Sequence, residues 1–143
     1  MVSEESVSRE NKEDKQADGD DSALSVSRKL AVEIARLAHD RNCFDISILE
    51  LAQRSPVARH FVIGTGTSAQ QIRSVAQEIE AYGKANQLGV FGRSGIQQGR
   101  WAVIDFVDVV VHLFDDEYRK FYDLELLWGD APRVAWERDG TGP

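Results

Sequence analysis

The chain has 143 residues, of which 42% are hydrophobic, and carries a formal net charge of −7. That length fits one domain, and the hydrophobic fraction is sufficient for a core. No stretch approaches the ~18 consecutive apolar residues of a membrane span, and the N-terminus lacks the apolar segment of a secretory signal. The single cysteine, Cys43, excludes an internal disulfide and suits a reducing compartment, so the sequence predicts a cytoplasmic protein.

The charge is concentrated at the start of the chain. Residues 1–22 hold eight acidic and three basic side chains, a net charge of −5, and almost no apolar ones. Such a segment buries too little apolar surface to offset the entropy cost of ordering, so we expect a disordered acidic tail. The sequence has no basic stripe, so direct sequence-specific recognition of nucleic acid is not expected.

The first predicted elements are one helix and two strands. Residues 23–42 carry apolar side chains at helical spacing, and Asp21 or Ser22 is suited to cap the start. The segment "CFDISILEL" predicts a short strand, and a loop with Pro56 follows it. The segment "HFVIGTG" then predicts a buried strand that ends at Gly64.

A second helix and a glycine-rich loop come next. The segment "TSAQQIRSVAQEIEAYGK" predicts the clearest helix, with Ser68 and Gln71 as a capping box and Gly83 at the exit. The segment "ANQLGVFGRSGIQQG" predicts a loop with a short strand at Val90 and Phe91.

A hairpin and a last helix complete the pattern. The apolar runs "RWAVID" and "DVVVHLF" predict paired strands, with Asp105 and Asp108 at the turn. Asp115 is suited to cap a last helix, which we expect to continue to Trp128 and to stop at Gly129.

This order of elements predicts an α/β fold with a mixed sheet and helices packed on it. We expect one domain over residues 23–132, between the disordered acidic tail of residues 1–22 and a flexible C-terminal arm of residues 133–143. The arm is predicted to be loose apart from Trp136.

The turn "GTGTS", Gly64–Ser68, joins a predicted strand to a helix N-terminus, where backbone N–H groups are able to bind a phosphate. It matches neither the G-x-G-x-x-G nor the P-loop pattern. A tight turn that needs positive φ is favoured. A nucleotide-binding or nucleotidyltransferase-like enzyme that uses this turn stays as the alternative.

Groups for metal binding or catalysis are sparse. His39, His60 and His112 lie far apart in the sequence, and Cys43 is expected to be a buried structural thiol. We therefore predict no catalytic, cofactor-binding or metal site. His112 is favoured as a core histidine bonded through one ring nitrogen, with an acid or tyrosine of the last helix as its candidate neighbour.

The aromatic residues leave two interpretations open. The predicted last helix has a wide apolar arc of two stripes, which are Phe121, Leu124 and Trp128 on one and Tyr118 and Tyr122 on the other. Trp101 on the predicted hairpin adds a further large ring. Core packing and an aromatic, acidic docking surface explain this arc equally well, since Trp and Tyr are favoured binding anchors.

Four motifs occur in order along residues 24–132. They are a G-T-G-T-S turn, a W-x-x-x-D strand, a D-V-V-V-H-x-F strand and an F-Y-x-L-E-x-L-W ending. In these motifs the chain resembles the ribosomal silencing factor family, also called Iojap-like. The resemblance implies a mixed α/β domain with a topology similar to that of nucleotidyltransferases, but without known catalysis.

The resemblance also implies a function and a partner. Members of the family bind the large ribosomal subunit through the ribosomal protein numbered fourteen, near the subunit interface. They thereby obstruct joining of the small subunit and repress translation when nutrients are short. Carried over by motif position, with His112 in support, the implied partner-binding residues are Trp101, Asp105, Tyr122, Leu124, Glu125 and Trp128.

The chain departs from the family pattern at two positions. Arg59 stands where an acidic residue is usual, which further weakens a catalytic interpretation. Val107 stands where glycine is usual, and because valine does not readily take positive φ, we expect a differently shaped turn. A plainer alternative for the whole molecule is a homodimer formed through the same aromatic residues.

Overall fold

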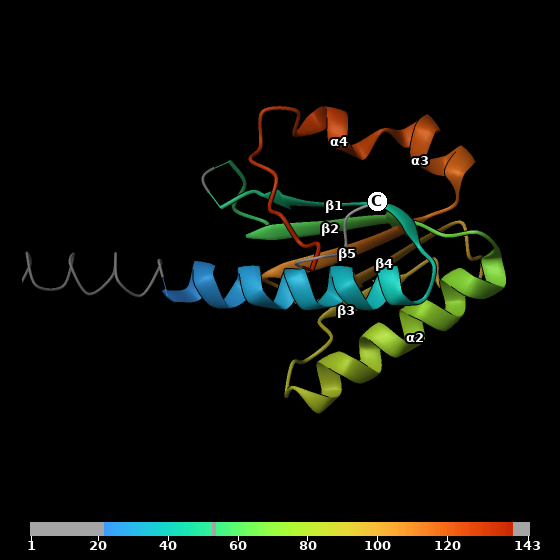
Figure 1. Cartoon of the computed structure of the whole chain (residues 1–143), viewed down its shortest axis with the longest axis horizontal. Helices are drawn as coiled ribbons and strands as arrows, with labels where there is room; N and C mark the ends of the chain where they lie inside the picture. The colour runs from blue at the N-terminus through green and yellow to red at the C-terminus, as the bar shows by residue number, and fades with distance from the viewer. Residues whose placement is uncertain (1–21, 53, 139–143) are drawn as a thin grey trace, which may run out of the picture.

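A five-stranded mixed sheet forms the centre of the computed structural model, which describes residues 22–52 and 54–138 (Figure 1). The strands lie in the order β1-β2-β5-β4-β3. The pair β2–β5 is parallel, and the other three pairs are antiparallel. The strand bounds are β1 Phe44–Glu50, β2 His60–Thr65, β3 Gly92–Ser94, β4 Trp101–Asp105 and β5 Val109–Phe114. The predicted mixed α/β fold is confirmed.

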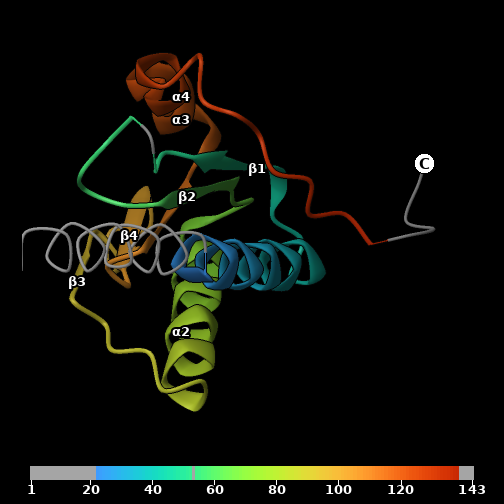
Figure 2. The ribbon, with the colours of Figure 1, turned by 90° about the vertical axis from the view of Figure 1, so that its left-hand side faces the viewer.

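Two long helices cover one face of this sheet. They are the N-terminal helix, residues 22–40, and α2, Ala69–Ala85, which lie on the same side of the sheet (Figure 2). Together with the inward side chains of the strands they enclose a core. The predicted cap of α2 is confirmed, since Ser68 Oγ accepts a hydrogen bond from the Gln71 N–H at 3.0 Å. The predicted exit at Gly83 is wrong. A Cβ there would lie 2.5 Å from Cε1 of Phe106, so Gly83 provides packing space inside the helix.

Two short helices, α3 Asp116–Tyr122 and α4 Leu124–Leu127, lie on the opposite face of the sheet (Figure 2). The sequence predicted one helix over this stretch, and that prediction is wrong. Asp123 takes a left-handed conformation with φ 42°, which ends α3 and starts α4 in a new direction. Aspartate tolerates this conformation better than most residues, so the helix breaks here without the glycine that usually indicates such a position.

The predicted hairpin is confirmed as β4 and β5, but its turn differs from expectation. Val107 takes φ 76°. The Asp108 N–H donates to Phe106 O at 3.0 Å, which closes a three-residue γ-turn around Val107. The Asp105 carboxylate also accepts from the Val107 N–H at 2.7 Å. These two bonds hold a β-branched residue in a conformation that it rarely adopts.

The other departures lie at the edges of the sheet. β3 begins at Gly92, after the predicted strand at Val90 and Phe91. At the far edge, the expected flexible arm instead lies along β1, where Arg133 forms a β-bridge with Leu49. Of the predicted arm, residues 133–138 are described by the structure, and residues 139–143 lie outside the described residues. The predicted tail of residues 1–22 lies outside the described residues except for Ser22.

Candidate functional site

Trp101, at the start of β4, is the centre of an aromatic group on the face that carries α3 and α4. Alternation along β4 turns Trp101 and Val103 to this face and buries Ala102 and Ile104 on the other. The Trp101 ring stacks on Phe114, with centroids 4.8 Å apart and an interplanar angle of 25°. The sequence predicted this division of the strand correctly.

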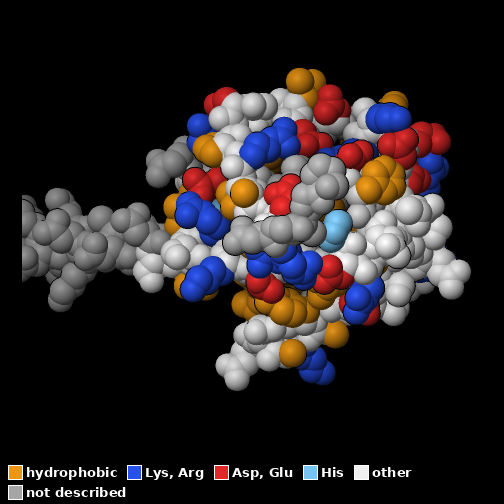
Figure 3. All heavy atoms as spheres, in the orientation of Figure 1, with side chains coloured by type: hydrophobic (Ala, Val, Ile, Leu, Met, Phe, Trp, Pro, Cys, Tyr) orange, Lys and Arg blue, Asp and Glu red, His pale blue; other side chains and the backbone are white. Residues whose placement is uncertain are grey.

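Two rings of α3 extend this group to the solvent. The rings of Trp101 and Tyr122 lie 4.8 Å apart, and those of Tyr122 and Phe121 lie 5.0 Å apart. Tyr122 is 47% exposed and Phe121 is 78% exposed. We call these three residues the aromatic surface. Leu126 and Leu127 add exposed apolar side chains on α4. In the space-filling view, hydrophobic side chains reach the surface above α3 and α4 (Figure 3).

Sequence reasoning missed Phe121 as an exposed residue. It placed Phe121 on one apolar stripe with Leu124 and Trp128, on the assumption of an unbroken helix, and did not include it among the partner-binding residues. A second core lies between the sheet and the short helices, with Leu49, Phe61, Ile63 and Phe114 among its buried residues. The break at Asp123 changes the phase of the helix, so that Leu124 and Trp128 pack on this second core while Phe121 faces solvent. No feature of the sequence besides Asp123 signals the break.

The structure does not bring all of the predicted partner-binding residues together. Leu124 and Trp128 are partly buried beneath the helices, where the Trp128 ring meets the edge of Phe61 at a centroid distance of 6.4 Å. Asp105 lies four residues along β4 from Trp101, which is ~13 Å at ~3.3 Å per residue. Its carboxylate is engaged in the turn. Only Trp101 and Tyr122, among the six predicted residues, belong to the aromatic surface.

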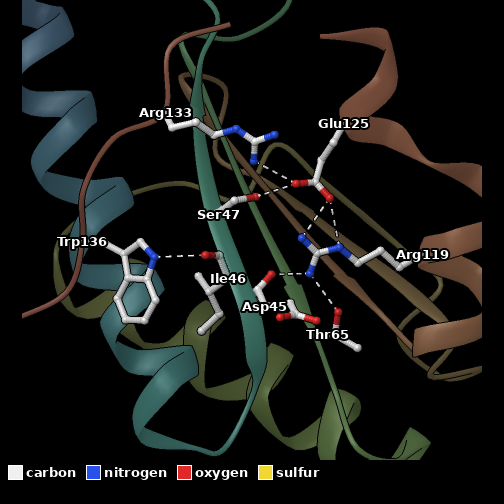
Figure 4. Close-up of polar contacts among 8 residues, drawn as sticks. All are labelled: Asp45, Ile46, Ser47, Thr65, Arg119, Glu125, Arg133 and Trp136. Carbon is white, nitrogen blue, oxygen red and sulfur yellow. Dashed lines mark hydrogen bonds and ion pairs between the residues drawn. The ribbon is translucent and has the colours of Figure 1, made fainter. Parts of the chain in front are cut away.

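Glu125, another predicted partner-binding residue, is the centre of a partly buried polar network between α4, β1 and the C-terminal segment (Figure 4). One carboxylate oxygen accepts from Nε and an η nitrogen of Arg119, at 3.1 and 2.9 Å. The other accepts from Ser47 Oγ at 3.0 Å and from Arg133 at 2.9 Å. Although burial acts to raise the pKa of Glu125, these hydrogen bonds hold it below its ordinary value. Glu125 therefore ties α4 to β1 and to the C-terminal segment.

Arg119 connects the same network to the sheet. Its guanidinium also donates to the backbone oxygen of Asp45 and to Thr65 Oγ1, the latter at 2.8 Å. Asp45 has φ 49° and lies at an irregularity in the β1–β2 register. The conformation of β1 thus presents a carbonyl to Arg119, and the pair fixes α3 over the edge of the sheet. The pattern of the sequence gives no sign of this contact, because it joins residues 74 positions apart.

The C-terminal segment is held by similar contacts on the far side of β1. The Val134 N–H donates to Ile48 O at 3.0 Å, and the Trp136 indole donates to Ile46 O at 3.0 Å (Figure 4). Arg138 pairs with Asp40 of the N-terminal helix at 2.8 Å. These contacts explain why the segment is ordered where the sequence suggested a loose arm.

His112 occupies the middle of β5, in a strand that is buried along its whole length. It is a core histidine, as predicted, but its neighbour is neither an acid nor a tyrosine. The Trp101 indole N–H donates to His112 Nδ1 at 3.1 Å. Burial lowers the pKa of His112 to about 4, so the ring is neutral near pH 7.

The Gly64–Ser68 turn differs from the predicted form. Neither Gly64 nor Gly66 has a positive φ. Gly66 is required for close packing instead, because a Cβ would lie 2.3 Å from Cγ1 of Ile72. Two N–H groups that a phosphate would need are already engaged: Gly66 N donates to Phe114 O, and Thr67 N donates to Gln71 Oε1. The turn is thus closed by bonds of the chain itself.

Charged residues border the aromatic surface at the start of α3. Asp115 caps the helix, with Asp116 and Glu117 in its first turn. Arg100 pairs with Asp115 at 2.7 Å and lies over the Tyr118 ring at 4.1 Å. Within residues 22–52 and 54–138, no group of three or more His, Cys, Asp or Glu residues is arranged to hold a metal ion. In the same residues, no helix is both long and apolar enough to cross a membrane.

Comparison with known proteins assigns a family to this chain. The family model described as "Ribosomal silencing factor during starvation" matches residues 25–142. The chain belongs to the ribosomal silencing factor family. The match includes the C-terminal segment, which the four sequence motifs had left outside.

Individual silencing factors show the same relationship. The ribosomal silencing factor RsfS of Bacillus subtilis is 38% identical over 108 residues, which are 75% of this chain and 92% of that protein. A crystal structure of a Chromobacterium violaceum protein has a TM-score of 0.68 at 26% identity, and the match covers 82% of this chain and 96% of that one. A more distant relative from Mus musculus, 26% identical over 98 residues, is named "Mitochondrial assembly of ribosomal large subunit protein 1"; the match covers 66% of this chain and 43% of that protein.

Proposed function

We propose that the protein represses translation by binding the large ribosomal subunit, through the ribosomal protein numbered fourteen, and blocking small-subunit joining. Membership of the ribosomal silencing factor family supports the general role. The name of the mouse relative favours the large subunit as the target. In this proposal the protein acts in the cytoplasm and carries out no reaction.

The single observation that carries the proposal is the aromatic surface. The Tyr122 ring contacts both Trp101 and Phe121, and Tyr122 and Phe121 are exposed. Large rings at a surface are favoured anchors because they bury much apolar area at little cost in side-chain entropy. Leu126 and Leu127 widen the apolar area that a partner would cover.

The charge of the chain favours the same kind of partner. The formal net charge is −7, and α3 begins with Asp115, Asp116 and Glu117. A protein that is bound to ribosomal RNA is generally basic, so its field attracts an acidic domain and raises the association rate. Once the domain is bound, inhibition needs only that its volume occupies the joint between the subunits.

The rival enzyme hypothesis finds less support. A nucleotide site at the Gly64–Ser68 turn would need free backbone N–H groups, and those of Gly66 and Thr67 are engaged within the chain. The turn is also crowded against Ile72. A homodimer through the aromatic surface would compete with ribosome binding, and light scattering of the parent protein distinguishes the two.

Co-sedimentation with isolated large subunits tests the proposal. We expect Phe121→Ala and Tyr122→Ala each to weaken binding about thirtyfold, which corresponds to ~2 kcal/mol for a lost anchor. The parent protein should also reduce the joining of added small subunits in a sucrose gradient. Both variants remove exposed rings, so the melting temperature should change little.

Phe91→Ala is the matched control. Phe91 is 78% exposed, like Phe121, but its N–H pairs with Asp105 O at the other end of β4. This variant should bind as the parent does. Equal losses of binding for Phe91→Ala and Phe121→Ala would show that the docking surface is wrongly assigned. A parent protein that does not bind large subunits would refute the proposed function itself.

A further inference from the structure

His112 is the unexpected residue of the second core. The remaining five residues of β5 are apolar, and the whole strand is buried. The Nε2 atom of His112 is buried and has no hydrogen-bond partner among the described residues. An aliphatic side chain would fit such a strand without leaving a buried polar atom unpaired. The presence of an imidazole at this position therefore needs a reason beyond packing.

The contact with Trp101 supplies that reason. An indole N–H is only a donor, so His112 Nδ1 must be the acceptor in the 3.1 Å hydrogen bond. A histidine ring that accepts at Nδ1 is neutral and carries its proton on Nε2. The unpaired Nε2–H is thus the direct consequence of providing an acceptor to Trp101. Nε2 of His112 thus stays without a partner in the described part of the chain, while Nδ1 accepts the hydrogen bond from the half-buried Trp101 indole.

This hydrogen bond fixes the orientation of a half-buried indole. The Trp101 ring is held on one side by stacking on Phe114 and on another by Tyr122. Stacking alone allows a ring to slide and rotate within its plane, because such contacts are weakly directional. The bond to His112 removes that freedom, since it requires the indole nitrogen to point at Nδ1 of His112 on the neighbouring strand β5.

We propose that His112 is a positioning residue of the aromatic surface, whose Nδ1 holds Trp101 in the orientation in which it meets a partner. This inference rests on the proposed docking role of Trp101. A preorganised anchor binds more tightly because its ordering cost is met before the partner arrives. His112 itself, buried in β5, contacts no partner in this arrangement.

The test compares His112→Asn with His112→Leu. Asparagine places an oxygen where Nδ1 stands and can keep the acceptor, whereas leucine removes it. In the free protein, the Trp101 indole N–H, assigned by its loss in Trp101→Phe, should exchange with deuterium at least about tenfold faster in His112→Leu than in the parent. His112→Asn should resemble the parent. The melting temperature of His112→Leu should change little, because the loss of the hydrogen bond from Trp101 is offset by removal of the buried unpaired Nε2–H.

Binding to isolated large subunits gives the second measurement. We expect His112→Leu to bind about two- to tenfold more weakly than the parent, and to have no further effect in a Trp101→Phe background. An equal loss in both backgrounds, or unchanged indole exchange in His112→Leu, would overturn the inference. If His112→Asn does not fold, the exchange and binding of His112→Leu decide alone. If the parent itself does not bind, the proposed function fails, and the indole exchange still decides whether His112 positions Trp101.

Discussion

Substitution of Glu125 by glutamine separates a structural role from a docking role for a residue that the family pattern had marked as partner-binding. Four donors from Arg119, Ser47 and Arg133 converge on its carboxylate. The amide keeps one acceptor oxygen and directs an NH2 group at the remaining donors. Because glutamine is neutral, Glu125→Gln leaves both Arg119 and Arg133 without this charged partner, and we expect the loss to appear as reduced stability.

The magnitude follows from the contacts and their exposure. Breaking a fully buried ion pair costs ~3–5 kcal/mol, whereas exposed pairs contribute ~0–1 kcal/mol. The side chains of Arg119 and Glu125 are 14% and 23% exposed, between these limits. We therefore expect the free energy of unfolding to fall by about 2 kcal/mol and the melting temperature by about 8 °C. Urea denaturation measures the first, and a thermal scan measures the second.

The pH dependence gives an independent check with a definite sign. The pKa of Glu125 is lowered in the folded chain, so its stabilising effect is present above the unfolded-state pKa of about 4.3. That effect is lost as the pH falls through the folded-state pKa. The stability difference between the parent and Glu125→Gln should thus be full at pH 7 and should shrink in acid.

Glu117→Gln provides the control, since Glu117 is also an acid of this helical layer but its side chain is 83% exposed. Its ion pair with Arg100 spans 3.4 Å, and its loss should change the free energy of unfolding by less than about 0.5 kcal/mol. The reasoning is refuted if Glu125→Gln unfolds like the parent while its binding to large subunits is lost. In that case Glu125 contacts a partner, as the motif suggested.

Two further substitutions test the backbone of the turns. Val107→Gly should raise the free energy of unfolding by about 1 kcal/mol, because glycine adopts φ 76° without strain, and a loss of stability in urea denaturation would contradict the assigned turn. Gly66→Ala should lower the free energy of unfolding by about 1–3 kcal/mol, because its Cβ would clash with Ile72. Gly64→Ala is the control and should cost less, since its Cβ would be no closer than 3.5 Å to any neighbour. Equal effects of the two variants in thermal unfolding would count against the packing argument.

Periodicity predicted the two helices that pack on the sheet and the strands β1, β2, β4 and β5, because each buries one face or its whole length. The cap at Ser68 was also predictable, since its effect is local. The helix break at Asp123 and the positive φ of Val107 were not. Left-handed backbone at a residue other than glycine is uncommon, so residue type did not indicate it at either position, although short-range bonds such as that from the Val107 N–H to the Asp105 carboxylate hold it.

The residues of the candidate site also differ in how far the sequence predicted them. The sequence indicated Trp101 and Tyr122 as candidates for a docking surface, because the apolar arc that their rings belong to is wider than one buried helix face needs. It was not able to separate Glu125 from the surface, since its partners Ser47 and Arg133 come from distant parts of the chain. Nor did it identify Phe121 as exposed, because that depends on the break after Tyr122.

The sequence by itself determined the class of fold, the family and the presence of a surplus of aromatic rings. Those properties depend on composition, on local spacing and on motifs that neighbouring residues form together. Only the tertiary structure decided which rings face solvent, that His112 accepts from Trp101, and that the C-terminal segment lies against β1. These features depend on contacts between residues far apart in the chain. Such contacts do not change the periodicity of the local sequence around either residue, so the sequence pattern cannot predict them.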